Sequence, residues 1–289
     1  MRTLLIIIVL NISVTVIGQK ASVLDSLNNL LESVYEADQS PRNLIDSIQR
    51  YFGYNSTEMK SLWSKIKYSD SINIKTITNI IDNYGWLGIS QVSVKANKAL
   101  FLVIQHSDIS TQLKYLPILK TASSDGKASA KDYAYLQDRI NMNTGRFQIY
   151  GTQLNGSKKG SLDFYPIKDE PNVNKRRKSI GLPPLEEYIK TFEQEYTISK
   201  IDRYKHKFVV LCYLVESRGS KPNSDVRIYW GNNKYIGKTD SNGVFKIIAD
   251  IKYKKWALIF KKNGFQTISY FVGDVDKDVY TIILELNKN

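Results

Sequence analysis

The sequence is poor in the residues that hold transition metals or staple a fold. It contains one cysteine, Cys212, and two histidines, His106 and His206. A single cysteine cannot form an intramolecular disulfide, and two histidines far apart in the chain make a poor ligand set for a metal. Cys212 shares one face of a predicted strand with Phe208, Val210 and Leu214, which favours a buried structural thiol. We therefore expect no metal site and no cofactor.

The short motifs that mark many enzyme families are also missing. The sequence has no G-x-S-x-G, no H-E-x-x-H, no P-loop and no dinucleotide-binding glycine motif. No residue is marked by its neighbours as a nucleophile. The absence of these motifs and of a marked nucleophile slightly favours a protein that binds a ligand without transforming it over an enzyme.

Long apolar runs are absent after the first residues. Leu4 to Val16 is apolar except for Asn11, Ser13 and Thr15, and Arg2 precedes it. Such a run before small residues is typical of a secretory signal peptide, predicted here as residues 1–18. The alternative is an uncleaved anchor, but about 13 residues is short for a membrane span of roughly 20. We expect a secreted or periplasmic protein with no transmembrane segment after cleavage.

Acidic residues are outnumbered by basic ones, which gives a formal net charge of +13 and a pI near 9.5. The excess is spread along the chain. It favours anionic partners, such as polyanionic glycans or a membrane surface, although solubility alone is the simpler explanation. Export and dispersed charge both argue against nucleic-acid binding.

The apolar pattern changes near residue 200. Before it, apolar residues recur at helical spacing, with short strands predicted at 147–152 and 162–165 around a glycine-rich loop at 155–160. After it, short segments alternate with period two. We predict an α+β multidomain protein: a helix-rich domain at 19–200 with a small β element, then an antiparallel β-sandwich at 201–289 that folds alone.

Within the helical part, turn and capping residues predict three helix boundaries. The segment Glu36 to Arg42 is predicted to break the first helix, with Pro41 in the first turn of the next one. Asp70 or Ser71 is predicted to cap a separate helix, and Ser56 or Thr57 another.

The predicted sandwich contains a turn of the sequence Thr239-Asp240-Ser241-Asn242-Gly243-Val244-Phe245, and later Asn263-Gly264-Phe265. Over about residues 205–289 it resembles the carboxypeptidase-regulatory-like domain, a transthyretin-like β-sandwich. The resemblance implies a non-catalytic module that contacts carbohydrate or protein. Asp240 and Asn242 are expected to serve the turn and not a metal. The aromatic residues Trp230, Tyr253 and Trp256 could stack on sugars if exposed, although core packing is favoured for Trp256.

A set of short polar motifs follows in order between about residues 35 and 190. They are Asp38-Gln39 with Arg42, Gly85-Trp86, Gln105-His106-x-Asp108, Tyr135-Leu136-x-Asp138-Arg139, Gln148-x-Tyr150-Gly151-Thr152-Gln153, and Val173-Asn174-x-Arg176-Arg177 with Gly181 to Leu185. The set is similar to a bacterial family of unknown function with Q-H-x-D, D-R and Y-G-T-Q elements. The resemblance implies a domain identity and no mechanism.

His106 is the candidate catalytic residue. As a general base it needs a carboxylate to orient it, and Asp108 or Asp138 could serve. The alternative is a histidine that only interacts with the carboxyl end of its helix. Arg139 and Arg176 could hold an anionic group through forked donors. Alternatively, Arg139 pairs with an acid of its own domain, such as Asp138.

We expect the polar elements to line one partly open pocket, because unpaired buried polar groups would cost about 1–3 kcal/mol each. A polar ligand would hydrogen-bond to Gln148, Thr152 and Gln153. Alternatively, these side chains satisfy backbone groups beside a short sheet. The predicted ligand-binding residues are Gln105, Arg139, Gln148, Tyr150, Thr152, Gln153, Arg176 and Trp86. The main hypothesis is binding of a small polar or anionic ligand, with a hydrolase-type enzyme using His106 as the alternative.

Overall fold

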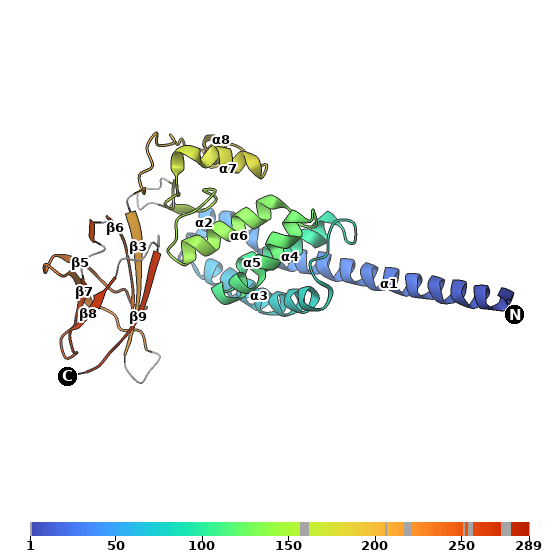
Figure 1. Ribbon diagram of the computed structural model, residues 1–289, viewed down its shortest axis with the longest axis horizontal. Coiled ribbons are helices and arrows are strands. Elements are labelled where there is room, and N and C mark those ends of the chain that lie inside the picture. Colours follow the sequence, from blue (N-terminus) through green and yellow to red (C-terminus); the bar gives the residue numbers. More distant parts are fainter. Residues whose placement is uncertain are drawn as a thin grey trace. The chain divides into compact units, whose positions relative to one another are not determined.

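The structure, a computed structural model, describes residues 2–156, 162–205, 207–216, 221–250, 252–253, 257–272 and 279–288 (Figure 1). His206, Trp256 and most of the predicted glycine-rich loop lie outside these residues. The chain divides into two compact units, residues 1–136 and 137–289. A helix-rich N-terminal region is followed by β-sheets, which confirms the α+β class.

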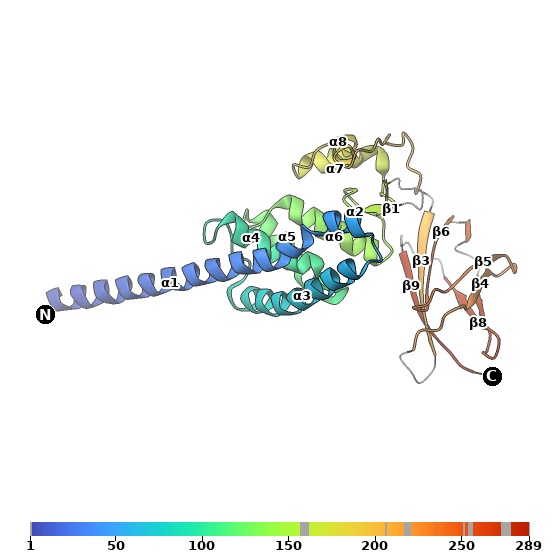
Figure 2. The ribbon, with the colours of Figure 1, turned by 180° about the vertical axis from the view of Figure 1, so that it is seen from behind.

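The first unit consists of helices. They are α1 (Arg2–Arg42), α2 (Ile45–Phe52), α3 (Thr57–Tyr84), α4 (Val94–His106) and α5 (Ile109–Ser124), followed by α6 (Ala130–Asn143), which runs across the boundary between the units. Helix α1 packs against α3 and α4, and α4 also packs against α5 (Figure 1 and Figure 2). Helix α4 is buried on most sides, as its apolar run predicts.

Side-chain caps set where several of these helices begin. The Met59 amide donates to Ser56 Oγ at 3.1 Å at the start of α3. The Ala96 amide donates to Ser93 Oγ at 3.1 Å at the start of α4. These bonds satisfy N–H groups that the first turn of a helix leaves unpaired. The prediction of a cap at Ser56 is confirmed.

The two predicted breaks are wrong. Helix α1 continues through Glu36 to Arg42, and α3 continues through Asp70. Arg42 donates to both carboxylate oxygens of Asp70 at 2.8 Å and to Asp38 one helical turn away, so Asp70 pairs with another helix instead of capping its own. Pro41 lies in the last turn of α1, where it cannot donate to the carbonyl four residues earlier, and the helix ends at the next residue.

The residues predicted as a signal peptide belong to the backbone of α1. Within the part of the chain that the structure describes, no helix is both long enough and apolar enough to cross a membrane. Cleavage before Gln19 stays a prediction.

The second unit begins with a small subregion. Strand β1 (Leu154–Gly156) pairs antiparallel with β2 (Leu162–Phe164), followed by η1 (Glu170–Asn172), α7 (Val173–Ser179) and α8 (Leu185–Lys190). Phe164, Ile167, Val173, Leu185 and Ile189 form its core. The strand predicted at 147–152 is instead an irregular segment, in which only Gln148 forms a bridge, to Ile167.

The remainder forms two sheets. One has the order β6 (Val244–Asp250), β3 (Lys207–Glu216), β9 (Val279–Leu286), and the other has the order β5 (Tyr235–Lys238), β4 (Arg227–Trp230), β7 (Ala257–Lys261), β8 (Ile268–Phe271). One core cluster contains buried residues of both sheets, as in a sandwich. The first sheet is mixed, because β3 and β9 run parallel, with Cys212 opposite Ile282. The expectation of a purely antiparallel sandwich is corrected in this respect.

Three details of the sandwich bear on the expectations. Cys212 is buried, and burial raises the pKa of its thiol to about 12. Trp230 is also buried and stacks on Tyr253 at 5.2 Å between ring centroids, so it offers no exposed sugar platform. Asp240 Oδ1 accepts from the amides of Asn242 and Val244, both at 2.9 Å, which is turn chemistry.

Candidate functional site

A histidine–aspartate pair lies in the first unit. His106 is the last residue of α4, and its Nδ1 is 3.0 Å from Oδ1 of Asp38 on α1. Asp38 is completely buried, whereas about a fifth of the His106 side chain is exposed. In the neutral ring this contact places the proton on Nδ1 and leaves Nε2 as an acceptor. The arrangement is that of an imidazole oriented by a carboxylate.

Further donors keep Asp38 ionised. Gln39 Nε2 donates to Oδ2 at 2.6 Å, and Arg42 donates to Oδ1 at 3.1 Å. Burial alone would raise the pKa of Asp38, but the hydrogen bond and charge of His106, together with Gln39 and Arg42, bring this pKa below its ordinary value. Asp38 can therefore stabilise a proton on His106.

The imidazole lines a pocket of about 250 Å³ in the first unit. Two serines also line it, but their hydroxyls are engaged: Ser107 Oγ donates to the Ile104 carbonyl and Ser71 Oγ to the Tyr68 carbonyl, each at 2.7 Å. The geometry therefore offers an acid–base group without an activated serine. The full lining is Lys67, Asp70, Ser71, Ile74, Val103, His106, Ser107 and Asp108.

Asp108 serves the start of α5. Its carboxylate accepts from the amides and hydroxyls of Ser110 and Thr111, chiefly from the Ser110 hydroxyl, and these bonds hold the pKa of Asp108 far below its usual range. The carboxylate that orients His106 is thus Asp38. Gln105 is buried, and its Oε1 has no hydrogen-bond partner among the described residues.

A second polar cluster lies in the second unit, around the segment 149–152. Asp138 on α6 is completely buried, and its carboxylate accepts from the amides of Ile149 at 2.7 Å, Tyr150 at 3.1 Å and Thr152 at 3.1 Å. The Thr152 hydroxyl donates to it at 3.2 Å. Burial raises the pKa of Asp138, and these hydrogen bonds oppose that rise. Asp138 therefore holds the backbone of this segment.

Two arginines of α7 hold the other side of the same backbone. Arg176 Nε donates to the Ile149 carbonyl at 2.8 Å, and Arg177 Nη1 donates to the carbonyls of Tyr150 and Gly151 at 2.8 and 3.2 Å. Arg176 also pairs with Asp169. The predicted anion-holding donor Arg176 is thus occupied by its own unit.

The side chains of Gln148 and Gln153 form hydrogen bonds at the two ends of this segment. Gln148 Nε2 donates to the carbonyls of Gln153 and Tyr165, and its Oε1 accepts from the Gln153 amide at 2.7 Å. Gln153 Nε2 in turn donates to Thr152 Oγ1 at 3.0 Å. Gly151 has φ +65°, and a Cβ there would lie 2.7 Å from Ile167 Cδ1. The segment from Gln148 to Gln153 is a rigid part of the fold, in line with the backbone-satisfying alternative.

Arg139 differs from these arginines. It follows Asp138 on α6 and is half-buried, and its Nε is inaccessible and unbonded. Among the residues that the structure describes, none forms a hydrogen bond or ion pair with its guanidinium. Burial lowers the pKa of Arg139, and no neighbouring carboxylate offsets that effect. The predicted alternative, a pair with Asp138, is not formed.

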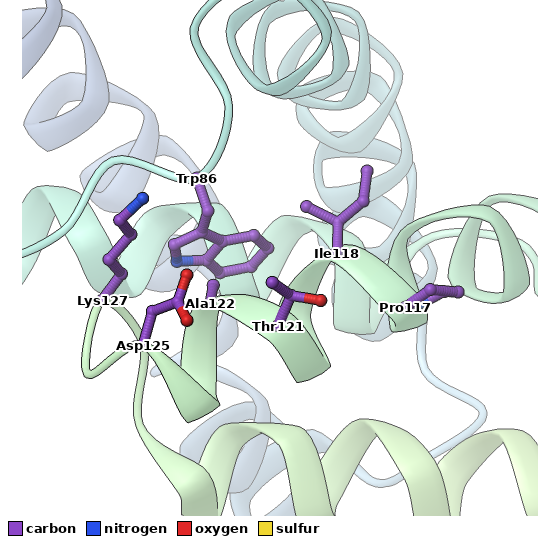
Figure 3. Close-up of a pocket in the computed structure, with 7 residues that line it drawn as sticks. All are labelled: Trp86, Pro117, Ile118, Thr121, Ala122, Asp125 and Lys127. Atoms are coloured by element: carbon purple, nitrogen blue, oxygen red, sulfur yellow. The ribbon is translucent and has the colours of Figure 1, made fainter.

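The predicted site residues are shared between the two units of the chain. Trp86 lines a pocket on α5 that shares no lining residue with the pocket of His106 (Figure 3). Sequence reasoning considered Asp38 with His106, Asp108 and Asp138 only as a weak cation set and did not name it as the carboxylate that orients His106. The i, i+4 spacing of Asp38 and Arg42 was a usable signal for their pairing. Within the described ranges, no cluster of His, Cys, Asp and Glu could hold a metal ion. The meeting of His106, Arg139 and Gln153 in one pocket stays a prediction.

Comparison with known proteins identifies the family of this chain but no activity. No curated protein matches the chain. Among solved structures, the Bacillus anthracis TIE protein is similar over 28% of this chain and 17% of its own, with 20% sequence identity and a TM-score of 0.21. So short and loose a match carries no argument. The model of the family of unknown function DUF6624 matches residues 25–201. The chain belongs to this family, whose matched segment contains both the Asp38–His106 pair and the segment held by Asp138.

Proposed function

We propose that the family segment binds a small anion, such as a carboxylate or phosphate group, through Arg139. The observation that carries the proposal is a half-buried guanidinium without an acidic partner among the described residues. Three other arginines of this chain pair with acids: Arg42 with Asp38 and Asp70, Arg176 with Asp169, and Arg203 with Glu170. Arg139 alone among these four departs from that pattern.

The physical reason is the cost of an unpaired buried charge. A guanidinium stays protonated at neutral pH, so burial cannot be relieved by loss of the proton. Burial of the Nε of Arg139 without an acceptor costs that group its hydrogen bond to water. A ligand carboxylate or phosphate would accept the forked N–H groups and offset this cost.

The test is stabilisation by simple anions. Thermal unfolding of the full chain is followed with inorganic phosphate, sulfate or acetate, at ionic strength held constant with chloride. Binding to the folded state alone raises the melting temperature with anion concentration. We expect this rise in wild type, its loss in Arg139→Gln, and its retention in Arg146→Gln, which removes an exposed arginine nearby in sequence. An equal rise in all three proteins would contradict the proposal.

The Asp38–His106 pair favours a second candidate, a hydrolase that uses His106 as general base. Because the pocket serines donate to main-chain carbonyls, the nucleophile in this proposal is water, activated by His106 Nε2. Asp38 holds the ring and stabilises the protonated imidazole that forms.

Hydrolysis of 4-nitrophenyl acetate and 4-nitrophenyl phosphate tests this candidate. We expect a loss of about 100-fold or more in His106→Gln, the contribution typical of a general base. His206→Gln is the matched control, since it removes the other histidine. Equal rates in the two variants would leave no catalytic role for His106.

We also propose export of the chain and an interaction role for the sandwich. The apolar run before Gly18 supports cleavage, and mass spectrometry of exported protein should find a chain beginning at or near Gln19. The two-sheet core and the turn at Asp240 support a non-catalytic module of the carboxypeptidase-regulatory-like kind. A chain that begins at Met1 after export would contradict cleavage of a signal peptide. Hydrolytic activity confined to residues 201–289 would contradict a non-catalytic role for the sandwich.

A further inference from the structure

The first unit has a second pocket, of about 340 Å³, beside Trp86. Trp86 follows α3, one face of α5 forms the floor, and the loop after α5 closes one end (Figure 3). The lining residues are Trp86, Pro117, Ile118, Thr121, Ala122, Asp125 and Lys127. None of these residues belongs to the proposed acid–base pocket or to the Asp138 cluster.

The indole nitrogen of Trp86 lacks an acceptor. Trp86 is 5% exposed, and its Nε1 forms no hydrogen bond within the described part of the chain. Buried N–H groups in folded proteins nearly always have a partner. A donor that is buried and unpartnered, on a residue that lines a pocket, is a candidate contact for a ligand oxygen.

Two opposite charges lie near this donor. In the view of Figure 3, the carboxylate of Asp125 and the ammonium of Lys127 lie on the nitrogen side of the indole. Both come from fixed backbone: the Asp125 amide donates to the Thr121 carbonyl at 2.9 Å and the Lys127 amide to the Ala122 carbonyl at 2.8 Å. Both residues are exposed, and among the residues that the structure describes neither side chain forms an ion pair. This end of the pocket therefore presents one free anion and one free cation.

The opposite end of the pocket is apolar. Ile118 and Pro117 lie beyond the six-membered ring of Trp86 in Figure 3, and Ala122 lies below it. The stem of Lys127 passes close to Gly88, where a Cβ would come within 3.1 Å of Lys127 Cγ, so the glycine leaves room for this side chain. One pocket thus combines an N–H donor, a cation, an anion and an apolar wall.

We propose that this pocket binds a free apolar α-amino acid. The ligand carboxylate accepts from Trp86 Nε1 and pairs with Lys127, the ligand ammonium pairs with Asp125, and the side chain packs on Ile118 and Pro117. The volume lies at the lower end of the range for ligand pockets, which suits a molecule of this size. A ligand that lacked either charge would leave one of the two free groups unmatched.

Three probes of equal apolar shape separate the contributions of the charges. L-leucine carries both charged groups, 4-methylpentanoate lacks the ammonium, and 3-methylbutylamine lacks the carboxylate. Isothermal calorimetry on the full chain should show that leucine binds most tightly, 4-methylpentanoate about tenfold more weakly, and the amine not at all. The proposal would be overturned if leucine did not bind at concentrations up to about 10 mM, or if leucine and the amine bound equally well.

Variants assign each contact. Trp86→Phe keeps an aromatic wall but loses the donor, and Lys127→Met keeps the stem but loses the charge; each should weaken leucine binding about tenfold. Asp125→Asn should bring leucine and 4-methylpentanoate to the same affinity. Arg139→Gln should bind leucine as wild type does, which separates this pocket from the proposed anion site. Unchanged leucine affinity in Trp86→Phe would refute the assignment, with circular dichroism showing that the variant is folded.

Discussion

Two aspartates, one in each unit, are buried to the same extent and have opposite surroundings. Asp138 accepts hydrogen bonds from three backbone amides and one hydroxyl of a single segment. Asp38 accepts from the side chains of Gln39 and Arg42 and contacts the imidazole of His106. Burial raises the pKa of Asp138, while charged partners lower the pKa of Asp38.

The difference shows how to separate a structural carboxylate from one that serves a site. Asp138 has its acceptor capacity filled by main chain, so the shape of the segment depends on it. Asp38 instead orients a ring that reaches a pocket. Burial and polarity are the same in the two cases, and only the identity of the donors distinguishes them.

The largest effect is expected for Asp138→Asn. The amide replaces one acceptor with a donor, which then faces a backbone N–H, and the charge that strengthens the remaining bonds is lost. We expect the free energy of unfolding to fall by about 3 kcal/mol, measured by urea denaturation of the full chain. The exposed Asp163→Asn should change it by less than about 0.5 kcal/mol. An Asp138→Asn protein as stable as wild type would mean that the charge does not hold this segment.

The next effect is expected for Arg177→Lys. The guanidinium is completely buried and donates to the carbonyls of Pro183, Tyr150 and Gly151. A lysine ammonium cannot reproduce this fork, so we expect a loss of about 2 kcal/mol in urea denaturation.

Arg176→Lys is the comparison for this prediction. Arg176 is half-buried, so water can replace some of its bonds, and the loss should be about 1 kcal/mol. If Arg176→Lys lowered the free energy of unfolding more than Arg177→Lys does, burial would not decide how strongly these arginines hold the backbone of residues 149–151.

A smaller and pH-dependent effect is expected for Asp38→Asn. Because folding lowers the pKa of Asp38 from 3.8, its contribution is fully present above about pH 4 and is lost as pH falls through the folded pKa. We expect Asp38→Asn to be about 1–2 kcal/mol less stable than wild type at pH 7, with the difference shrinking below pH 4. Exposed Asp25→Asn should show no such dependence.

The same variant has a second readout. Long-range nitrogen NMR should place the His106 proton on Nδ1 in wild type and show a mixture of tautomers in Asp38→Asn. Identical spectra would show that Asp38 does not orient the ring.

The smallest effect is expected for Asp108→Asn. Asparagine caps a helix about as well as aspartate, so the free energy of unfolding should change by only a few tenths of a kcal/mol. The His106 tautomer should not change, since Asp38 holds the ring. A shifted tautomer in Asp108→Asn would restore the role that the sequence suggested for Asp108.

Local sequence patterns predicted many of the helices and strands. Period-two alternation marked β3, and the buried face of Cys212 followed from it. Serine at the start of a helical stripe marked α3. The breaks predicted at Glu36–Arg42 and Asp70 failed because Arg42 links Asp38 to Asp70 across two helices, a contact between residues far apart in sequence. The parallel pairing of β3 with β9 has no local signal either.

For the candidate site, the sequence by itself determined which residues are ionisable or polar, and that His106 ends a buried helix. Only the tertiary structure decided what each one does, because a carboxylate takes whichever donors packing brings within about 3 Å. Packing gave His106 the carboxylate of Asp38. It gave Asp138 a ring of backbone amides, and it left the guanidinium of Arg139 without a partner among the described residues.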